Sequence, residues 1–404
     1  MKEFYIESVV ADILGISKRS LSKFKKDDLF TNQYKKKKGY INYQILKNLE
    51  IFKKLENTKW DVELKTKSRK KFQIIELFAG AGGLAIGLKN AGFNTLLLND
   101  IDKDSCKTLS RNTDYEVIND DIKNLSFKKY KDKVDVLSGG FPCQAFSYAG
   151  KKLGFKDTRG TLFYEFVKRV QECNPKVILA ENVKGLQSHD SGRTLGTICN
   201  VIDEIGYDLV EPRVLKAIFY QVPQKRERLF LVGIRKDLNA SNLFKYPDPC
   251  SEIYTLKDAL KKGKLYSSNC PKSDGSTYPK KKKKVLDLVP PGGYWKDLPD
   301  KIQREFMGNS YFLGGGKTGL ARRLSWEEPS LTLTCAPAQG QTERCHPSQT
   351  RPLTIREYAR IQTFPDNWEF EGSVSSQYRQ IGNAVPVNLG HAIGRSLIRL
   401  LNKI

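Results

Sequence analysis

The chain has 404 residues, with 69 Lys and Arg against 45 Asp and Glu, and a formal charge of +24. This length accommodates two or three domains, and the eight scattered cysteines favour a reducing cytoplasm over a disulfide framework. A charge surplus of this size predicts nucleic acid as a partner and is a poor match to a free-standing small-molecule enzyme. The plainer alternative is a lysine-rich proteome, with Lys35–Lys38 and Lys280–Lys284 as solvated loops.

No stretch of the sequence approaches the length of a membrane span, and the first ten residues contain no long apolar run. The three histidines are dispersed and no cysteine pair has metal-site spacing, so we expect no metal ion. A soluble cytoplasmic protein without membrane contact is therefore expected.

The first 60 residues have the pattern of a small helical domain. Apolar residues between Val9 and Ile16 lie on one helix face, broken by a glycine, and Ser17 is a candidate N-cap for a basic helix, Lys18–Lys26. The pair resembles a helix-turn-helix whose second helix reads DNA. A helical adaptor without DNA contact is the alternative. The amphipathic stretch Tyr40–Leu55 predicts a further helix.

A charged linker at residues 61–71 leads into a different pattern. Phe72–Phe78 predicts a buried strand, Ala79–Gly83 is a glycine turn, and a helix is expected from Leu84. Strand, glycine turn and helix form a cradle for a nucleotide, because glycine lets the backbone approach a ligand closely. The turn is neither the dinucleotide GxGxxG pattern nor a Walker motif, and a purely structural turn is the alternative.

Acidic residues follow the next two expected strands. Asp100 comes after Thr95–Leu98, and Asp121 comes after Glu116–Ile118. An acid about twenty residues after the glycine turn is well placed for ribose hydroxyls. Alternating strands and helices with acids at the strand ends predict a doubly wound parallel α/β sheet that binds a nucleoside.

The following expected strand, Val134–Leu137, runs into GGFPCQAFSYAG at Gly139–Gly150. Two glycines and a proline place Cys143 on a loop tip at the same sheet edge. The local sequence leaves two interpretations open, a reactive thiol and a core-filling one.

Two further candidate sites follow along the chain. Glu181 comes after the expected strand Lys176–Leu179, where ligands of α/β sheets bind. Arg226 and Arg228 occupy alternate residues before the expected strand Leu229–Ile234 and so lie on one side of it. The alternative for Glu181, Arg226 and Arg228 is that they are ordinary solvated charges on a loop or on the surface.

Six short motifs stand in the order found in bacterial DNA (cytosine-5) methyltransferases of restriction-modification type, namely FAGAGG, GFPCQ, ENVKG, QKRER, the segment Arg351–Trp368 and QIGNAVP. The resemblance covers about Phe72 to Leu397. It implies a Rossmann-like S-adenosylmethionine-dependent methyltransferase domain at residues 72–240 plus 378–404, completed by a last helix at Val387–Leu401. It also implies a smaller irregular target-recognition domain at 241–377, beside the helical extension at 1–60.

The resemblance assigns catalytic roles to four residues. Cys143 stands where the family's thiolate adds to carbon 6 of a cytosine flipped out of double-stranded DNA. Glu181 resembles the glutamate that helps protonate nitrogen 3, and Arg228 the arginine that contacts the cytosine. Arg226 is expected to support the loop or a phosphate.

The resemblance also assigns a cofactor site for S-adenosylmethionine. Asp100 replaces the usual ribose-binding glutamate, and Ile101 replaces a residue, often aromatic, that packs on adenine. Asn383 is expected to return to this site from far along the chain. The expected cofactor residues are Phe78, Gly80, Gly82, Gly83, Leu84, Asp100, Ile101, Asp121, Ile122, Gly140, Pro142, Asn383 and Ala384.

Partners follow from the same resemblance. It implies a companion restriction endonuclease, a monomer and a nucleoid-associated location. For the N-terminal extension, the helix-turn-helix pattern predicts autoregulation of transcription. The basic, loop-rich interval between Arg235 and Arg351 suits the reading of major-groove edges. Two alternative functions stay open, an RNA cytosine-5 methyltransferase and a DNA-binding regulator with an inactive catalytic body.

Overall fold

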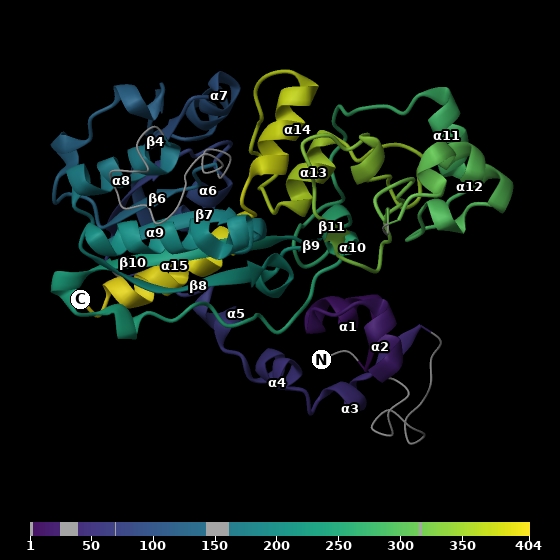
Figure 1. Ribbon diagram of the computed structural model, residues 1–404, viewed down its shortest axis with the longest axis horizontal. Coiled ribbons are helices and arrows are strands. Elements are labelled where there is room, and N and C mark those ends of the chain that lie inside the picture. The colour runs from purple at the N-terminus through teal and green to yellow at the C-terminus, as the bar shows by residue number, and fades with distance from the viewer. Residues whose placement is uncertain (1–2, 25–38, 69, 143–160, 315–316) are drawn as a thin grey trace.

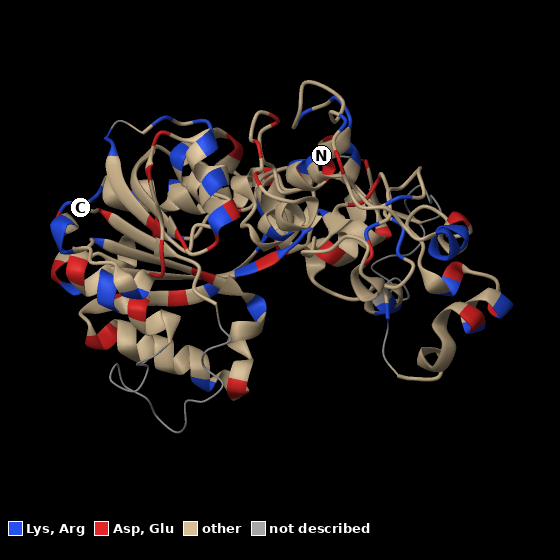
Figure 2. Cartoon of the chain, turned by 90° about the horizontal axis from the view of Figure 1, so that it is seen from above, with Lys and Arg blue, Asp and Glu red and all other residues tan. Residues whose placement is uncertain are grey.

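The computed structural model describes residues 3–24, 39–68, 70–142, 161–314 and 317–404. Figure 1 shows three parts: purple N-terminal helices, a large sheet covered by helices, and a green loop-rich part at the opposite end from the sheet. Lys and Arg residues are spread over all three parts (Figure 2), so the charge surplus is not confined to one of them.

The N-terminal part is a small mixed unit around one apolar core. Its elements are β1 (Phe4–Ile6), α1 (Glu7–Leu14), α2 (Lys18–Phe24), β2 (Tyr40–Asn42), α3 (Tyr43–Leu46) and α4 (Glu50–Asn57). A left-handed Gly15 ends α1, and the Ser17 hydroxyl accepts a hydrogen bond from the Ser20 N–H at 3.0 Å. The expected break at the glycine and the expected serine cap are therefore confirmed.

The single helix expected over Tyr40–Leu55 is wrong. Residues 40–42 form β2, which pairs antiparallel with β1, and the Asn42 side chain then caps α3 by accepting from the Gln44 N–H at 2.9 Å. The strand depends on a partner some forty residues earlier in the chain, so the local apolar spacing could not reveal it.

The first helix after the N-terminal part, α5 (Trp60–Glu63), packs on the large sheet part. Glu63 Oε1 accepts from Arg395 Nη2 at 2.7 Å, and the Arg399 guanidinium lies 5.7 Å from the Trp60 ring centroid. Asp61 Oδ2 accepts from the Ser251 N–H at 2.9 Å. The segment predicted as a charged linker thus begins as a helix bound to the neighbouring part.

The large sheet has seven strands in the order β5-β4-β3-β6-β7-β10-β8. Its strands are β3 (Phe72–Leu77), β4 (Phe93–Asp100), β5 (Glu116–Asn119), β6 (Val136–Gly139), β7 (Val177–Val183), β8 (Tyr207–Lys216) and β10 (Glu227–Arg235). Every strand that the sequence predicted is present. The expectation of a fully parallel sheet needs correction, because β10 is antiparallel to both of its neighbours. Only a short connection separates β8 from β10, and short connections join antiparallel strands.

Helices cover both faces of the sheet, as a doubly wound fold requires. They are α6 (Gly83–Ala91), α7 (Lys103–Asn112), α8 (Leu162–Cys173), α9 (Arg193–Glu204) and α15 (Val387–Leu401). The apolar sides of α6 and α15 pack with one face of the sheet, and those of α8 and α9 pack with the other. The predicted last helix is confirmed at its predicted bounds.

The loop-rich part contains short elements joined by long connections. They are α10 (Leu256–Leu260), α11 (Lys280–Asp287), α12 (Asp300–Met307), β11 (Ser330–Leu331) and α13 (Ile355–Ile361), after which α14 (Val374–Asn383) returns to the sheet. β11 pairs with β9 (Gln224–Lys225) just before β10. Within the motif segment Arg351–Trp368, only α13 is helical, and Thr354 caps its N-terminus in a capping box. Among the described residues, no helix is both long enough and apolar enough to cross a membrane.

The contact between α6 and α15 gives a test of the packing. A Cβ at Gly87 would lie 2.5 Å from the Val387 carbonyl oxygen, whereas a Cβ at Gly196 in α9 would meet nothing within 4 Å. We expect Gly87→Ala to lower the free energy of unfolding by about 1–3 kcal/mol, because backbone cannot yield as a side chain can. Gly196→Ala should raise it by about 0.5–1 kcal/mol. If urea unfolding shows that both substitutions change the free energy of unfolding in the same direction, this account of the packing is contradicted.

Candidate active site

A cavity of about 580 Å³ lies where β3, β4, β6 and β7 end. We call it the carboxyl-edge cavity. The predicted site residues that line it are Phe78, Gly80, Gly83, Leu84, Asp100, Ile101, Gly140, Pro142, Glu181, Arg228, Asn383 and Ala384. Residues from distant parts of the chain, including the end of α14, therefore meet in one cavity of ordinary ligand-binding size.

The glycine turn between β3 and α6 forms one wall of the cavity. Gly80 has a φ of +54°, and a Cβ there would meet no atom within 4 Å, so the backbone faces open space. A Cβ at Gly82 would lie 2.7 Å from the Leu109 side chain, which shows that Gly82 serves helix packing and not the cavity wall. The cluster of glycines in the sequence thus combines two physical requirements, and only the structure separates them.

Asp100 holds this turn in place. Its Oδ2 accepts from the Gly80 N–H at 2.8 Å, and its Oδ1 accepts from the Asp102 N–H at 2.8 Å. Burial raises the pKa of Asp100, against the opposing effect of these backbone hydrogen bonds. The carboxylate is therefore anchored at the cavity wall.

Besides Gly82, two more predicted cofactor residues, Asp121 and Ile122, do not line the carboxyl-edge cavity. Asp121 caps a short 3-10 helix by accepting from the Lys123 N–H at 3.0 Å, and Ile122 is buried in the core beneath the sheet. Both residues follow β5, and their contact with a ligand stays a prediction.

Glu181 and Arg228 form an ion pair inside the cavity. They extend from the adjacent strands β7 and β10, and Arg228 Nε lies 2.7 Å from Glu181 Oε1. Burial raises the pKa of Glu181, and the positive charges of Arg228 and Arg226 oppose that rise. The pair is close to the root of the predicted cysteine turn, because a Cβ at Gly140 would lie 3.0 Å from Glu181 Oε2.

Arg226 supports the cavity from behind. Its side chain is buried and donates to the carbonyl oxygens of Leu333, Gly382 and Asn383 at 3.2, 2.8 and 3.3 Å. These bonds join the strand that carries Arg228 to the end of α14 and to the loop-rich part. The arrangement fits the expected supporting role within the protein, and Arg226 does not line the cavity.

Cys143 lies outside the described residues, as does the rest of the turn to residue 160. The described residues leading to it, Gly140, Phe141 and Pro142, line the carboxyl-edge cavity. Asn182 Nδ2 fixes this approach by donating to the Phe141 carbonyl oxygen at 2.9 Å.

The sequence interpretation missed Glu76, which is on β3 and lines the cavity. Its side chain is only 3% exposed, and Oε2 has no hydrogen-bond partner among the described residues. Burial raises the pKa of Glu76 well above its ordinary value, and the nearby charges of Glu181 and Asp100 raise it further. An acidic residue within the apolar run FQIIELF was the available signal.

The cavity chemistry fits S-adenosylmethionine. Four acidic residues, Glu76, Asp100, Asp102 and Glu181, line it, and the cofactor carries a positively charged sulfonium and an ammonium group. A buried carboxyl oxygen without a partner in the described protein favours a cationic or hydrogen-bond-donating ligand. The open glycine turn adds backbone access beside these groups.

Comparisons with known proteins identify the family. The family model of the C-5 cytosine-specific DNA methylase matches residues 72–399. The Type II methyltransferase M.Eco47II of Escherichia coli is 58% identical over 407 residues, which span 100% of this chain and 97% of the relative. The Type II methyltransferase M.PspPI of Psychrobacter is 53% identical, over 98% of this chain and 96% of the relative.

Solved structures agree on the fold. A prophage-encoded protein of E. coli, described as a DNA modification methyltransferase, is 25% identical with a TM-score of 0.63 over 82% of this chain and 99% of its own. The Dnmt2 methyltransferase of S. pombe is 17% identical with a TM-score of 0.52, over 83% of this chain and 99% of its own. The Rossmann-like methyltransferase fold inferred from the motifs is confirmed. The chain therefore belongs to the C-5 cytosine-specific DNA methylase family and is a DNA (cytosine-5) methyltransferase that uses S-adenosylmethionine.

Proposed function

We propose that Glu181 and Arg228 bind the flipped cytosine while Cys143 attacks it. The observation that carries this proposal is the ion pair at 2.7 Å inside the carboxyl-edge cavity, beside the residues that lead to Cys143. A carboxyl group and a guanidinium held together present both donors and acceptors to the polar edge of a base. The buried position also strengthens these interactions relative to water.

The chemistry explains why these residue types are needed. Carbon 5 of cytosine is a weak nucleophile until the Cys143 thiolate adds to carbon 6 and makes carbon 5 enamine-like. The protonated carboxyl of Glu181 gives its proton to nitrogen 3, which offsets the charge that sulfur addition creates. Arg228 orients the base and holds Glu181. The bound cofactor would supply the methyl group to carbon 5, a base then removes the carbon 5 proton, and the bond from carbon 6 to sulfur breaks, which releases the Cys143 thiolate.

The cofactor would be held by the residues of the glycine turn and the end of β4. Gly80 would offer its backbone and Asp100 its carboxylate, and Phe78, Leu84 and Ile101 supply apolar surface. Asn383 and Ala384 close the cavity from α14. Asp121 and Ile122, which follow β5, remain proposed neighbours of the adenine.

The cellular role follows from the relatives, which are named Type II methyltransferases. We propose that methylation protects the cell's DNA from a companion restriction endonuclease, that the chain acts as a monomer, and that it works in the cytoplasm at the nucleoid. Flipping a base from the stack costs a few kcal/mol, and the basic surplus favours the phosphate contacts that offset it.

The N-terminal part is proposed to bind DNA upstream of the chain's own gene. The two helices joined at Gly15 support this, because Arg19 and Lys23 are exposed on the second of them. In footprinting with the full-length chain, we expect protection of the upstream DNA, and the double variant Arg19→Ala, Lys23→Ala should lose it. Retained methylation by the variant would verify its fold. An upstream region left unprotected by the intact chain would contradict the proposal.

The substrate proposal is tested by incubating the chain with methyl-labelled cofactor and either duplex DNA or tRNA. Label should enter DNA and not RNA. Label confined to tRNA would favour the RNA methyltransferase alternative, and no label with retained DNA binding would favour the inactive regulator.

A further inference from the structure

The loop-rich part displays an apolar tip. Phe312 and Leu313 directly follow a 3-10 turn at Gly308–Tyr311, and their exposed fractions are 82% and 66%. Large apolar side chains are seldom left adjacent and exposed without a function. Among the described residues, no other pair of sequence neighbours of this size and apolarity is exposed to this degree.

Contacts within the protein hold this tip in a defined shape. The Tyr311 ring packs edge-on against Trp295 with centroids 6.0 Å apart, and Phe312 packs edge-on against Tyr311 at 5.3 Å. Lys317 Nζ donates to the carbonyl oxygens of both Ser310 and Leu313, the latter at 2.5 Å. Because Trp295 is buried in the core formed with α11 and α12, the tip is anchored to the fold.

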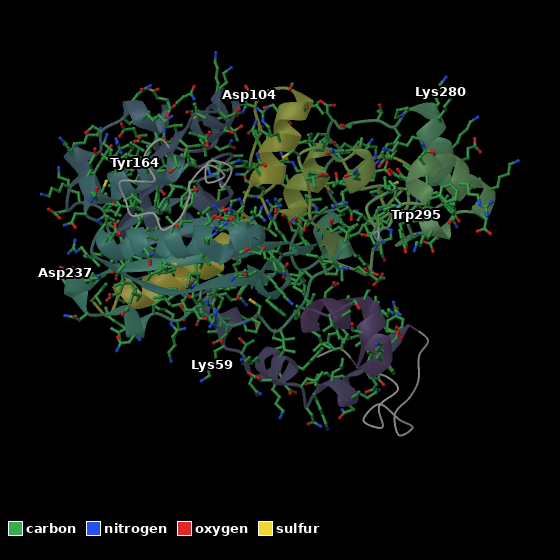
Figure 3. All side chains as sticks on the ribbon, in the orientation of Figure 1. Lys59, Asp104, Tyr164, Asp237, Lys280 and Trp295 are labelled. Atoms are coloured by element: carbon green, nitrogen blue, oxygen red, sulfur yellow. The ribbon has the colours of Figure 1, made fainter. Side chains whose placement is uncertain are left out.

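The surroundings of the tip are basic. Between Pro290 and Ser325, six Lys and Arg residues stand against three Asp and Glu residues, and of the six only Arg323 is buried. The Arg304 guanidinium lies 5.9 Å from the Tyr311 centroid, and Lys296 Nζ lies 5.5 Å from the Trp295 centroid. Figure 3 shows Trp295 at the same end of the molecule as Lys280, which begins the lysine-rich α11.

An apolar tip within a basic surface matches one class of partner best. Double-stranded DNA combines an anionic backbone with flat apolar base faces, so cations and apolar side chains both find complementary groups. A second copy of this chain would bring the same positive charge and so be repelled.

We propose that Phe312 and Leu313 form a wedge that inserts at a base step of the target duplex, separate from the flipped cytosine. Partial unstacking at that step would bend the DNA toward the loop-rich part and fix its register over the carboxyl-edge cavity. The proposal concerns a DNA contact and does not depend on which residues perform the methyl transfer.

The test uses the full-length chain and a short duplex that carries its methylated site, with 2-aminopurine substituted at successive positions around the site. Wild-type protein should raise fluorescence at one base step besides the target cytosine. Phe312→Ala and Leu313→Ala should abolish that rise and weaken binding about 5- to 100-fold, as expected for lost base stacking. The slope of affinity against salt should stay unchanged, because no phosphate contact is removed.

A matched control is Leu288→Ala, which removes an apolar side chain 49% exposed at the end of α11. It should bind and unstack DNA like the wild type. The wedge is overturned if the Phe312→Ala variant keeps both the fluorescence rise and the affinity, or if its salt slope falls together with its affinity. It is also overturned if sedimentation shows that the wild type self-associates and the variant does not.

Discussion

Replacing Cys143 by serine is expected to abolish methyl transfer, with a loss of at least about 10³-fold in rate. A hydroxyl is a far weaker nucleophile than a thiolate at neutral pH, so carbon 5 would not be activated. DNA binding should survive, because the Glu181–Arg228 pair and the basic surface are unchanged. Transfer of labelled methyl groups and gel-shift titration measure the two properties separately.

The matched control is Cys199→Ser in α9, outside the carboxyl-edge cavity. It should methylate like the wild type. A Cys143→Ser chain with substantial activity would remove Cys143 from the mechanism and require another nucleophile.

Replacing Glu181 by glutamine should lower the rate about 10²-fold or more, because the amide cannot give a proton to nitrogen 3. The protonated carboxyl is the active form, so activity should fall as pH rises through the pKa of Glu181. Burial raises that pKa, which extends activity to higher pH than an ordinary glutamate would allow. Arg228 acts in the opposite direction and lowers it.

Arg228→Gln therefore has a distinctive expected effect. The overall rate of this variant should fall because a cytosine contact is lost. The pH at which its activity declines should nevertheless be higher than in the wild type, because the pKa of Glu181 rises further. Glu227→Gln is the control, since this neighbour on β10 does not line the carboxyl-edge cavity. If the pH profiles of Arg228→Gln and the wild type coincide, Glu181 is not the proton donor.

Much of the large sheet part follows from the sequence because its determinants are local. The run FQIIELF gives a buried strand, and the glycines after it can form a turn and little else. Acids after strands then converge because parallel strands place their carboxyl ends at one edge. Asn383 was predicted as a cofactor residue from the order of the family motifs alone. Its position in the cavity depends on a chain reversal that no local pattern encodes.

The differences arise where distant partners decide the structure. The β2 strand exists because β1 pairs with it, although its residues also suit a helix. The orientation of β10 follows from its short connection to β8, and family motifs alone did not indicate it. Glu76 belongs to a strand pattern that predicts only burial, and its place in the site became visible once four acidic residues were found around one cavity.

Bisulfite sequencing of DNA from cells that express the chain tests the central claim most directly. Methylation at carbon 5 protects cytosine from conversion, so we expect one short sequence to keep its cytosine throughout the DNA. The same sequence should convert fully in cells that express Cys143→Ser. Complete conversion of every cytosine in cells with active wild-type protein would contradict the account.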